Sequence, residues 1–225
     1  MDRKQYVELN KILDILGWKR NRKEKCHIFN CENLQDAINE VCDIMEVIDI
    51  KVLYQQFYTP SDLAERLVKL ADIKESDEVL EPSAWKGAIV DEIKKTKCKY
   101  IRMYEIDEIN VKDLILHYYE EKDPDIIYWI EHCDFLEKEQ VELVDKILAN
   151  PPFSKSQDVK HILKMYEFLK PWWRIVSIAS SSIETREWKI YDEFKKLNPE
   201  FIKIEDWAFK ESWTMVNSVI VIINK

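Results

Sequence analysis

Short apolar runs alternate with amphipathic segments along most of the chain after residue 57. The apolar runs are typical of buried strands, and they lie at 78–81, 100–106, 126–130, 146–149, 174–179, 201–205 and 218–223. Apolar residues at helical spacing lie between most of these runs, at 60–71, 89–96, 108–120, 137–143, 158–169 and 187–197. This alternation predicts an α/β fold with a doubly wound, mostly parallel sheet of seven strands. Because no long helix separates the last two runs, we expect them to form an antiparallel hairpin.

The N-terminal residues follow a helical pattern instead. One apolar stripe at helical spacing ends at Gly17, and a second stripe spans residues 37–48. We therefore expect a helical N-terminal extension over residues 1–54 and a separate domain over residues 55–225. The basic side chains between the two stripes lie within 19–25. They predict a solvated loop or, alternatively, a patch that contacts phosphate groups.

Composition and charge exclude several classes of protein. The chain has 225 residues, 46% of them hydrophobic, which is enough for a full core and excludes intrinsic disorder. The formal net charge of −9 excludes a general nucleic-acid coat. No run approaches the ~18 apolar residues of a membrane span, and the N-terminus lacks the apolar stretch of a signal peptide. We therefore expect a cytoplasmic protein that does not contact a membrane.

Cysteine usage agrees with that compartment. The chain has 5 cysteines and no C-x-x-C pair, a pattern typical of free thiols in a reducing environment. A zinc site is the lesser alternative, and its candidate ligands are Cys26, His27, Cys31 and Cys42. We predict that the protein has no metal centre.

Polar and aromatic residues follow four of the predicted strands. The first strand ends in Glu81 and is followed by Pro82-Ser83-Ala84-Trp85-Lys86-Gly87. The second strand ends in Glu105-Ile106-Asp107, the third is followed by Asp134-Phe135, and the fourth by Asn150-Pro151-Pro152-Phe153. The carboxyl ends of parallel strands meet at one edge of an open α/β sheet, where ligands bind. The sequence therefore predicts a ligand site made from these segments.

The last of these segments suggests a specific chemistry. Its two prolines fix the backbone and lack N–H donors, so the preceding carbonyl oxygens stay available as acceptors. The Asn150 side-chain oxygen beside such a carbonyl forms a pair of acceptors suited to an exocyclic amino group, which carries two hydrogens. Phe153 offers a flat surface on which a base can stack. A purely structural turn is the alternative.

In this order the segments resemble the motifs of amino-group DNA methyltransferases that modify adenine N6, in that family's gamma arrangement. The resemblance covers residues 55–225 and implies a Rossmann-like methyltransferase fold for this catalytic domain, with S-adenosylmethionine as cofactor. The implied cofactor contacts are Tyr58, Thr59 and Pro60 of the segment Phe57-Tyr58-Thr59-Pro60, then Glu81, Pro82, Ser83, Ala84 and Gly87, then Glu105 and Ile106 at the ribose, and Asp134 and Phe135 at the adenine. A loop at 208–212 resembles the one beside the target-base pocket.

The same resemblance implies a mechanism and a substrate. A target adenine in DNA is rotated out of the base stack, and its N6 hydrogens are accepted by Asn150 and the Pro151 carbonyl as the nitrogen attacks the methyl group. The implied catalytic set is Asn150, Pro151, Pro152 and Phe153, with no metal and no histidine. The implied setting is a restriction-modification or phage system, and we expect a specificity or partner subunit to contribute to DNA binding.

Other functions stay open. Enzymes that methylate RNA or a protein glutamine side chain share Asn-Pro-Pro followed by an aromatic residue, although the segment 57–60 favours DNA. A methyltransferase-like subunit that binds DNA or a partner without catalysis is a further alternative. The intact Asn150 and Glu105 argue against that inactive subunit, whereas Trp85 argues for it.

Tryptophan stands where this family has glycine. The chain has 2 glycines and 8 tryptophans, whereas ordinary usage corresponds to roughly 16 glycines at this length. The family's cofactor loop reads Ser-Ala-Gly-x-Gly where this chain has Trp85, and glycine is also usual at Trp172, Trp173 and Trp213. Either the enzyme has diverged and lost activity, or UGA codons, which some genomes translate as glycine, have been translated as tryptophan.

Overall fold

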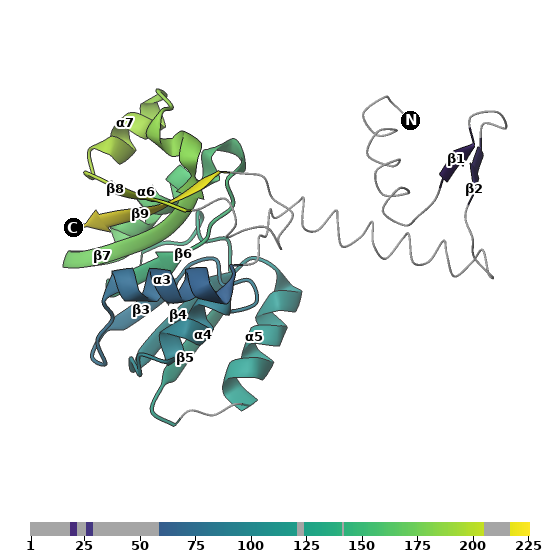
Figure 1. Ribbon diagram of the computed structural model, residues 1–225. Helices are drawn as coiled ribbons and strands as arrows, with labels where there is room; N and C mark the ends of the chain where they lie inside the picture. The colour runs from purple at the N-terminus through teal and green to yellow at the C-terminus, as the bar shows by residue number, and fades with distance from the viewer. Residues whose placement is uncertain (1–18, 22–25, 29–58, 121–123, 141, 205–216) are drawn as a thin grey trace. The chain divides into compact units, whose positions relative to one another are not determined.

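The chain divides into two structural units, Met1–Gln55 and Gln56–Lys225 (Figure 1). The computed structural model describes residues 19–21, 26–28, 59–120, 124–140, 142–204 and 217–225. In the first unit, the described residues form two short strands, β1 (Lys19–Asn21) and β2 (Cys26–Ile28), which pair antiparallel.

This hairpin lies where the sequence predicted a basic loop between two helical stripes. The basic segment 19–25 supplies β1 and the connection to β2, and its residues show no helical spacing of apolar positions. The antiparallel pairing of β1 with β2 satisfies backbone N–H and C=O groups of these two short strands. The two predicted helical stripes lie outside the described residues.

The second unit contains a seven-stranded sheet with the order β5-β4-β3-β6-β7-β9-β8. Its strands are β3 (Glu78–Glu81), β4 (Tyr100–Glu105), β5 (Ile127–His132), β6 (Val144–Ala149), β7 (Leu169–Ser180), β8 (Glu200–Lys203) and β9 (Ser218–Asn224). Strands β5, β4, β3, β6 and β7 are parallel, and β9 is antiparallel to both β7 and β8. The predicted sheet, including its antiparallel final hairpin, is confirmed.

Helices cover both faces of this sheet. On one face, α3 (Ser61–Ala71), α4 (Ala88–Lys94) and α5 (Glu108–Glu120) share an apolar core with the strands, and they lie together in Figure 1. On the other face, α6 (Gln157–Phe168) and α7 (Lys189–Lys195) pack into a second core. Short 3-10 turns occur at Ser154–Ser156 and Ser181–Glu184. Each helix buries residues spaced three or four apart, as an amphipathic helix must.

The predicted helix at 137–143 is wrong. A turn over 134–137 follows β5, and the other described residues up to β6 have no regular structure. The segment has only two apolar residues, two positions apart, so it has no apolar face for a helix to bury. Its charged side chains pair with the sheet instead: Lys138 contacts Glu131 of β5, and Glu142 accepts a hydrogen bond from Arg102 of β4 at 2.8 Å.

Strand β7 begins five residues before the predicted start at 174. Its pairing with β6 shifts from Leu169 opposite Val144 to Arg174 opposite Lys146, so extra residues of β7 bulge out of the ladder. Pro171, which has no N–H to donate, lies in this bulge. Sequence patterning missed the early start because the bulge interrupts the run of apolar residues.

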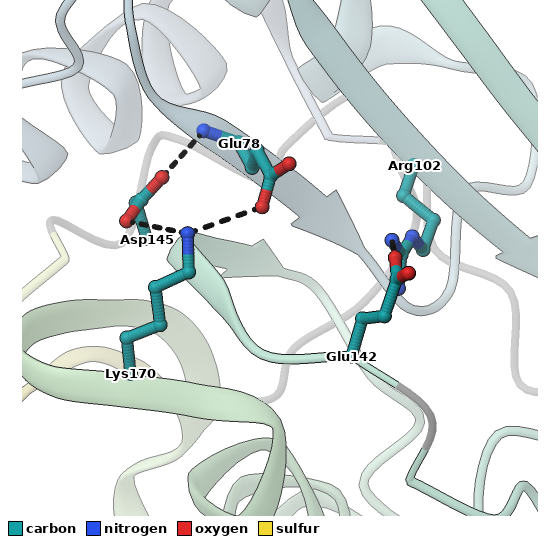
Figure 2. Close-up of polar contacts among 5 residues, drawn as sticks. All are labelled: Glu78, Arg102, Glu142, Asp145 and Lys170. Atoms are coloured by element: carbon teal, nitrogen blue, oxygen red, sulfur yellow. Dashed lines mark hydrogen bonds and ion pairs between the residues drawn. The ribbon is translucent and has the colours of Figure 1, made fainter.

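Ion pairs join the amino ends of the central strands (Figure 2). The Lys170 ammonium of β7 lies 3.1 Å from a carboxylate oxygen of Glu78 in β3 and 3.1 Å from one of Asp145 in β6. The second oxygen of Asp145 accepts a hydrogen bond of 2.8 Å from the Glu78 backbone N–H. One lysine therefore neutralises two carboxylates on adjacent strands, including the buried Asp145.

Replacing Lys170 by methionine should lower the free energy of unfolding by about 1–2 kcal/mol, because it leaves the buried Asp145 carboxylate without its cation. Lys69→Met is the matched control, since Lys69 pairs with Glu65 on the surface; it should cost less than about 1 kcal/mol. Urea unfolding followed by circular dichroism measures both. Equal effects of the two substitutions would contradict a structural role for the Lys170 ion pairs.

Candidate functional site

Three neighbouring strand ends define the centre of the candidate site. Strand β3 lies between β4 and β6, with Glu81 opposite Met103 of β4 and Leu80 opposite Ile147 of β6. All three strands run in the same direction, so their carboxyl ends lie at one edge of the sheet. This register brings the segments after β3, β4 and β6 together, as the sequence predicted.

Glu105, the last residue of β4, fastens the loop that follows β3. Its side chain is only 4% exposed, and its carboxylate accepts hydrogen bonds from the backbone N–H of Trp85 at 2.7 Å and of Asp107 at 2.9 Å. The Ala84 N–H also donates to the Tyr104 carbonyl at 3.0 Å. Burial raises the pKa of Glu105 above its ordinary value, although these hydrogen bonds act to lower it.

A second buried carboxylate, Glu81, lies at the end of β3. Its side chain is 2% exposed, and burial, together with the charges of Glu105 and Asp91, raises its pKa well above the ordinary value of 4.5. Among the described residues, neither its Oε2 atom nor the Ser83 hydroxyl has a hydrogen-bond partner. Buried polar atoms without partners are costly in a protein interior. These atoms therefore fit a polar or positively charged ligand group at the carboxyl end of β3.

Gly87 ends this loop and begins α4. Its φ of 79° lies in the left-handed region, and a Cβ atom there would lie 2.2 Å from the Tyr118 hydroxyl oxygen. The same hydroxyl is 3.0 Å from the Gly87 carbonyl oxygen and 2.9 Å from a carboxylate oxygen of Asp91. Glycine is favoured here because side chains rarely adopt this φ and a Cβ atom would displace the Tyr118 hydroxyl.

Asn150 follows β6 and is held by a residue far away in the sequence. Its side-chain Nδ2 donates a hydrogen bond of 3.0 Å to the hydroxyl of Thr59, which is buried. Pro151 is buried, and Phe153 packs against the core that α3, α4 and α5 share with the sheet. The hydrogen bond brings the segment before α3, predicted to contact the cofactor, to the predicted catalytic segment.

The residues at the end of β5 differ in their burial. Phe135, expected beside the cofactor adenine, is a core residue at 3% exposure, with its ring centroid 5.2 Å from that of Phe168. Asp134 and Ile106, in contrast, are exposed. The Cys133 N–H donates to the Glu105 carbonyl at 3.0 Å, so the end of β5 is joined to the end of β4.

Some predicted positions lie outside the described residues, namely Tyr58 and the late loop at 208–212. The structure also supplies supporting residues that sequence reasoning missed. Asn110 hydrogen-bonds to Glu105, and Tyr118 packs against Gly87. The sequence could have indicated Asn110 as a supporting residue, because it is a polar residue on the inward face of a helix. The sequence could not have indicated Tyr118, because a tyrosine among apolar helix positions predicts only a residue of the hydrophobic core.

Comparisons with solved structures identify the class of fold. A protein from Pyrococcus horikoshii, provisionally described as an RNA methyltransferase, shares 23% identity with a TM-score of 0.59, over 78% of this chain and 90% of its own. The modification subunit of a provisionally assigned type I restriction enzyme from Vibrio vulnificus shares 15% identity with a TM-score of 0.63, over 88% of this chain and 50% of its own. A dimethyladenosine transferase from Plasmodium falciparum shares 16% identity with a TM-score of 0.59, over 75% of this chain and 63% of its own. The fold is that of the Rossmann-like methyltransferases.

The family follows from the sequence match. A model of the N-6 DNA methylase family matches residues 53–173, more than half of the chain. The chain belongs to the N-6 DNA methylase family. S-adenosylmethionine is the cofactor that this family and fold support, as predicted from the sequence. The chain spans about half the length of the Vibrio subunit, and no curated protein matches it. None of the helices in the described part has the length and hydrophobicity that crossing a bilayer requires.

Replacing Glu81 by glutamine should stabilise the ligand-free protein at neutral pH, by on the order of 1 kcal/mol, because it removes a buried charge. A carboxyl whose pKa is raised on folding binds its proton more tightly in the folded state. The unmodified protein should therefore lose stability as the pH rises above 4.5, and Glu81→Gln should remove this loss.

Thermal unfolding between pH 4 and 8 measures the effect of the glutamine substitution. Glu92→Gln is the matched control, because Glu92 is also buried but has a cationic partner, Lys95, at 2.6 Å. This control substitution should not raise the melting temperature. A destabilised Glu81→Gln protein with an unchanged pH dependence would show that the carboxylate serves the fold alone.

Proposed function

We propose that this protein transfers a methyl group from S-adenosylmethionine to the N6 amino group of adenine in DNA. The observation that carries the proposal is the position of Asn150, which follows β6, the strand paired with β3, and is hydrogen-bonded to Thr59. An amine acceptor and a cofactor cradle then lie at adjacent strand ends. Membership in the N-6 DNA methylase family supports the same reaction.

Buried carboxylates and a backbone cradle would hold the cofactor. Glu105, whose carboxylate is oriented by two backbone N–H groups, would accept hydrogen bonds from the ribose hydroxyls. Glu81, whose pKa is raised by burial and by the nearby charges of Glu105 and Asp91, suits the amino group of the methionine part. Gly87 allows the loop backbone to turn tightly into α4. When bound, S-adenosylmethionine supplies a methyl group activated by its sulfonium sulfur.

Asn150 would position and activate the target nitrogen. Its Nδ2 donates to the Thr59 hydroxyl, so the amide oxygen is directed away from Thr59. That oxygen and the Pro151 carbonyl together would accept the two hydrogens of an exocyclic amine, which raises electron density on the nitrogen. Phe153 would stack against a base rotated out of the duplex. Positioning of the amine against the methyl group supplies most of the rate acceleration in such a site.

DNA is the favoured substrate, and RNA is the second candidate. The family name and the likeness to a restriction-enzyme modification subunit favour DNA. The Pyrococcus protein, provisionally described as an RNA methyltransferase, is matched over 90% of its length and favours RNA. The net charge of −9 opposes tight binding of any nucleic acid by this chain alone, so we infer that a partner subunit contributes to binding.

Substitutions at Asn150 and Thr59 test the mechanism. Asn150→Ala should lower methyl transfer at least about 100-fold with little change in cofactor affinity, because it removes an acceptor used mainly in the transition state. Thr59→Val should lower kcat by about tenfold, since the Asn150 amide loses its partner, whereas Thr59→Ser should retain most activity.

The measurement is transfer of a tritiated methyl group to duplex DNA, single-stranded DNA and RNA, with cofactor affinity determined separately by calorimetry. Incorporation into adenine N6 of DNA supports the proposal. Preferential incorporation into RNA would replace the substrate but keep the mechanism. Equal transfer by the unmodified protein and Asn150→Ala would remove Asn150 from the reaction.

A further inference from the structure

Two tryptophans have a backbone conformation that tryptophan rarely adopts. The residues other than glycine with positive φ, among those that the structure describes, are Asp72, Trp85, Lys97, Lys155, Ser156, Trp172 and Asn198. Aspartate and asparagine tolerate this region because their short side chains bond locally to the backbone. A bulky aromatic side chain has no such compensation. Lys97, Lys155 and Ser156 share positive φ but have no bulky ring. Trp85 and Trp172 are the bulky residues of this set, and for such residues positive φ is a genuine outlier.

Trp85 lies in the loop between β3 and α4, with a φ of 46°. Its N–H donates to Glu105 at 2.7 Å, so the fold fixes the backbone of this residue whatever its side chain is. Two residues later, Gly87 has a φ of 79° in the same loop. The loop thus needs left-handed backbone twice within three residues, and the chain has glycine at only one of these positions.

Trp172 lies in the bulge of β7, with a φ of 74°. Its N–H donates to the carbonyl of Lys225 at 2.5 Å, and the Lys225 N–H donates to the Trp173 carbonyl at 2.9 Å. Hydrogen bonds to the end of β9 therefore hold this backbone in place. The Trp172 side chain is 93% exposed, so no packing compensates for the strained conformation. A bulge residue with positive φ is a usual place for glycine.

The burial of the other tryptophans points in the same direction. Tryptophan is highly buried on average. Of the five tryptophans in the described residues, Trp129, Trp172 and Trp188 are exposed, at 62%, 93% and 63%, whereas Trp85 and Trp173 are half-buried. The chain has 8 tryptophans but 2 glycines, whereas about 16 glycines are ordinary at this length. A deficit of glycine and a surplus of unburied tryptophan occur together, with two tryptophans at glycine conformations.

We propose that residues 85 and 172 are glycines in the functional protein, because the codon at these positions is UGA and its host translates UGA as glycine. The inference on residue 172 concerns the fold alone. The inference on residue 85 also deepens the proposed function, on which it rests in part, since a glycine there opens the cofactor loop to close approach by a ligand.

Two observations on the native gene and protein test the codon directly. The codons for residues 85 and 172 should be UGA, and the masses of the peptides that contain these residues, from protein purified from its own host, should correspond to glycine. UGG at either position, or tryptophan in either native peptide, overturns the proposal for that position.

Variants test the backbone argument independently. Trp172→Gly should raise the melting temperature by about 2–5 °C. Trp172→Ala also removes the indole but keeps a Cβ atom, so it should raise the melting temperature much less. The same difference should separate Trp85→Gly from Trp85→Ala. Equal effects of glycine and alanine would overturn the claim that these are glycine positions. Trp188→Gly is the matched control, because Trp188 is exposed but has an ordinary φ of −107°. This substitution should not raise the melting temperature.

Cofactor titration separates this inference from the proposed function. Trp85→Gly should bind S-adenosylmethionine at least about tenfold more tightly than the tryptophan-containing protein. If glycine stabilises the protein but S-adenosylmethionine does not bind, the proposed function fails and the glycine assignment stands. If the tryptophan-containing protein already binds the cofactor as tightly as Trp85→Gly does, the assignment of residue 85 to the cofactor cradle is overturned.

Discussion

Parallel pairing of β3 with β4 on one side and β6 on the other is the constraint on which the candidate site depends. Once Glu81 lies opposite Met103, and Leu80 opposite Ile147, the residues that follow each strand meet at one edge of the sheet. Glu105 then reaches the backbone of the β3 loop, and Asn150 reaches Thr59. A shift of one residue in either register would turn each of these side chains to the opposite face.

The two edges of the sheet treat buried carboxylates in opposite ways. At the amino ends of the strands, Lys170 neutralises Asp145 and Glu78, so the charges are satisfied within the chain. At the carboxyl ends, the pKa values of Glu81 and Glu105 are raised by burial. Buried carboxyl groups whose pKa values are strongly raised are candidates for a functional site. The raised pKa values of Glu81 and Glu105 support the proposal that a ligand binds at the carboxyl ends of the strands.

Sequence patterning predicted the sheet and its final hairpin because buried parallel strands are continuous apolar runs. It failed at 137–143, where charged residues suited to a helix pair with the sheet instead, and at the bulge of β7, which no apolar pattern marks. Four loop segments of the site were predicted because motifs lie directly after strands. The buried position of Phe135 and the contact between Asn150 and Thr59 depend on tertiary packing, which spacing along the chain does not encode.

The most direct test of the account is a crystal structure of the protein with S-adenosylhomocysteine, the demethylated product of the cofactor, bound. The account predicts the ribose hydroxyls at the Glu105 carboxylate, the amino group near Glu81, and the sulfur on the side of the site that Asn150 faces. Product bound at another edge of the sheet, or a ribose without contact to Glu105, would contradict it.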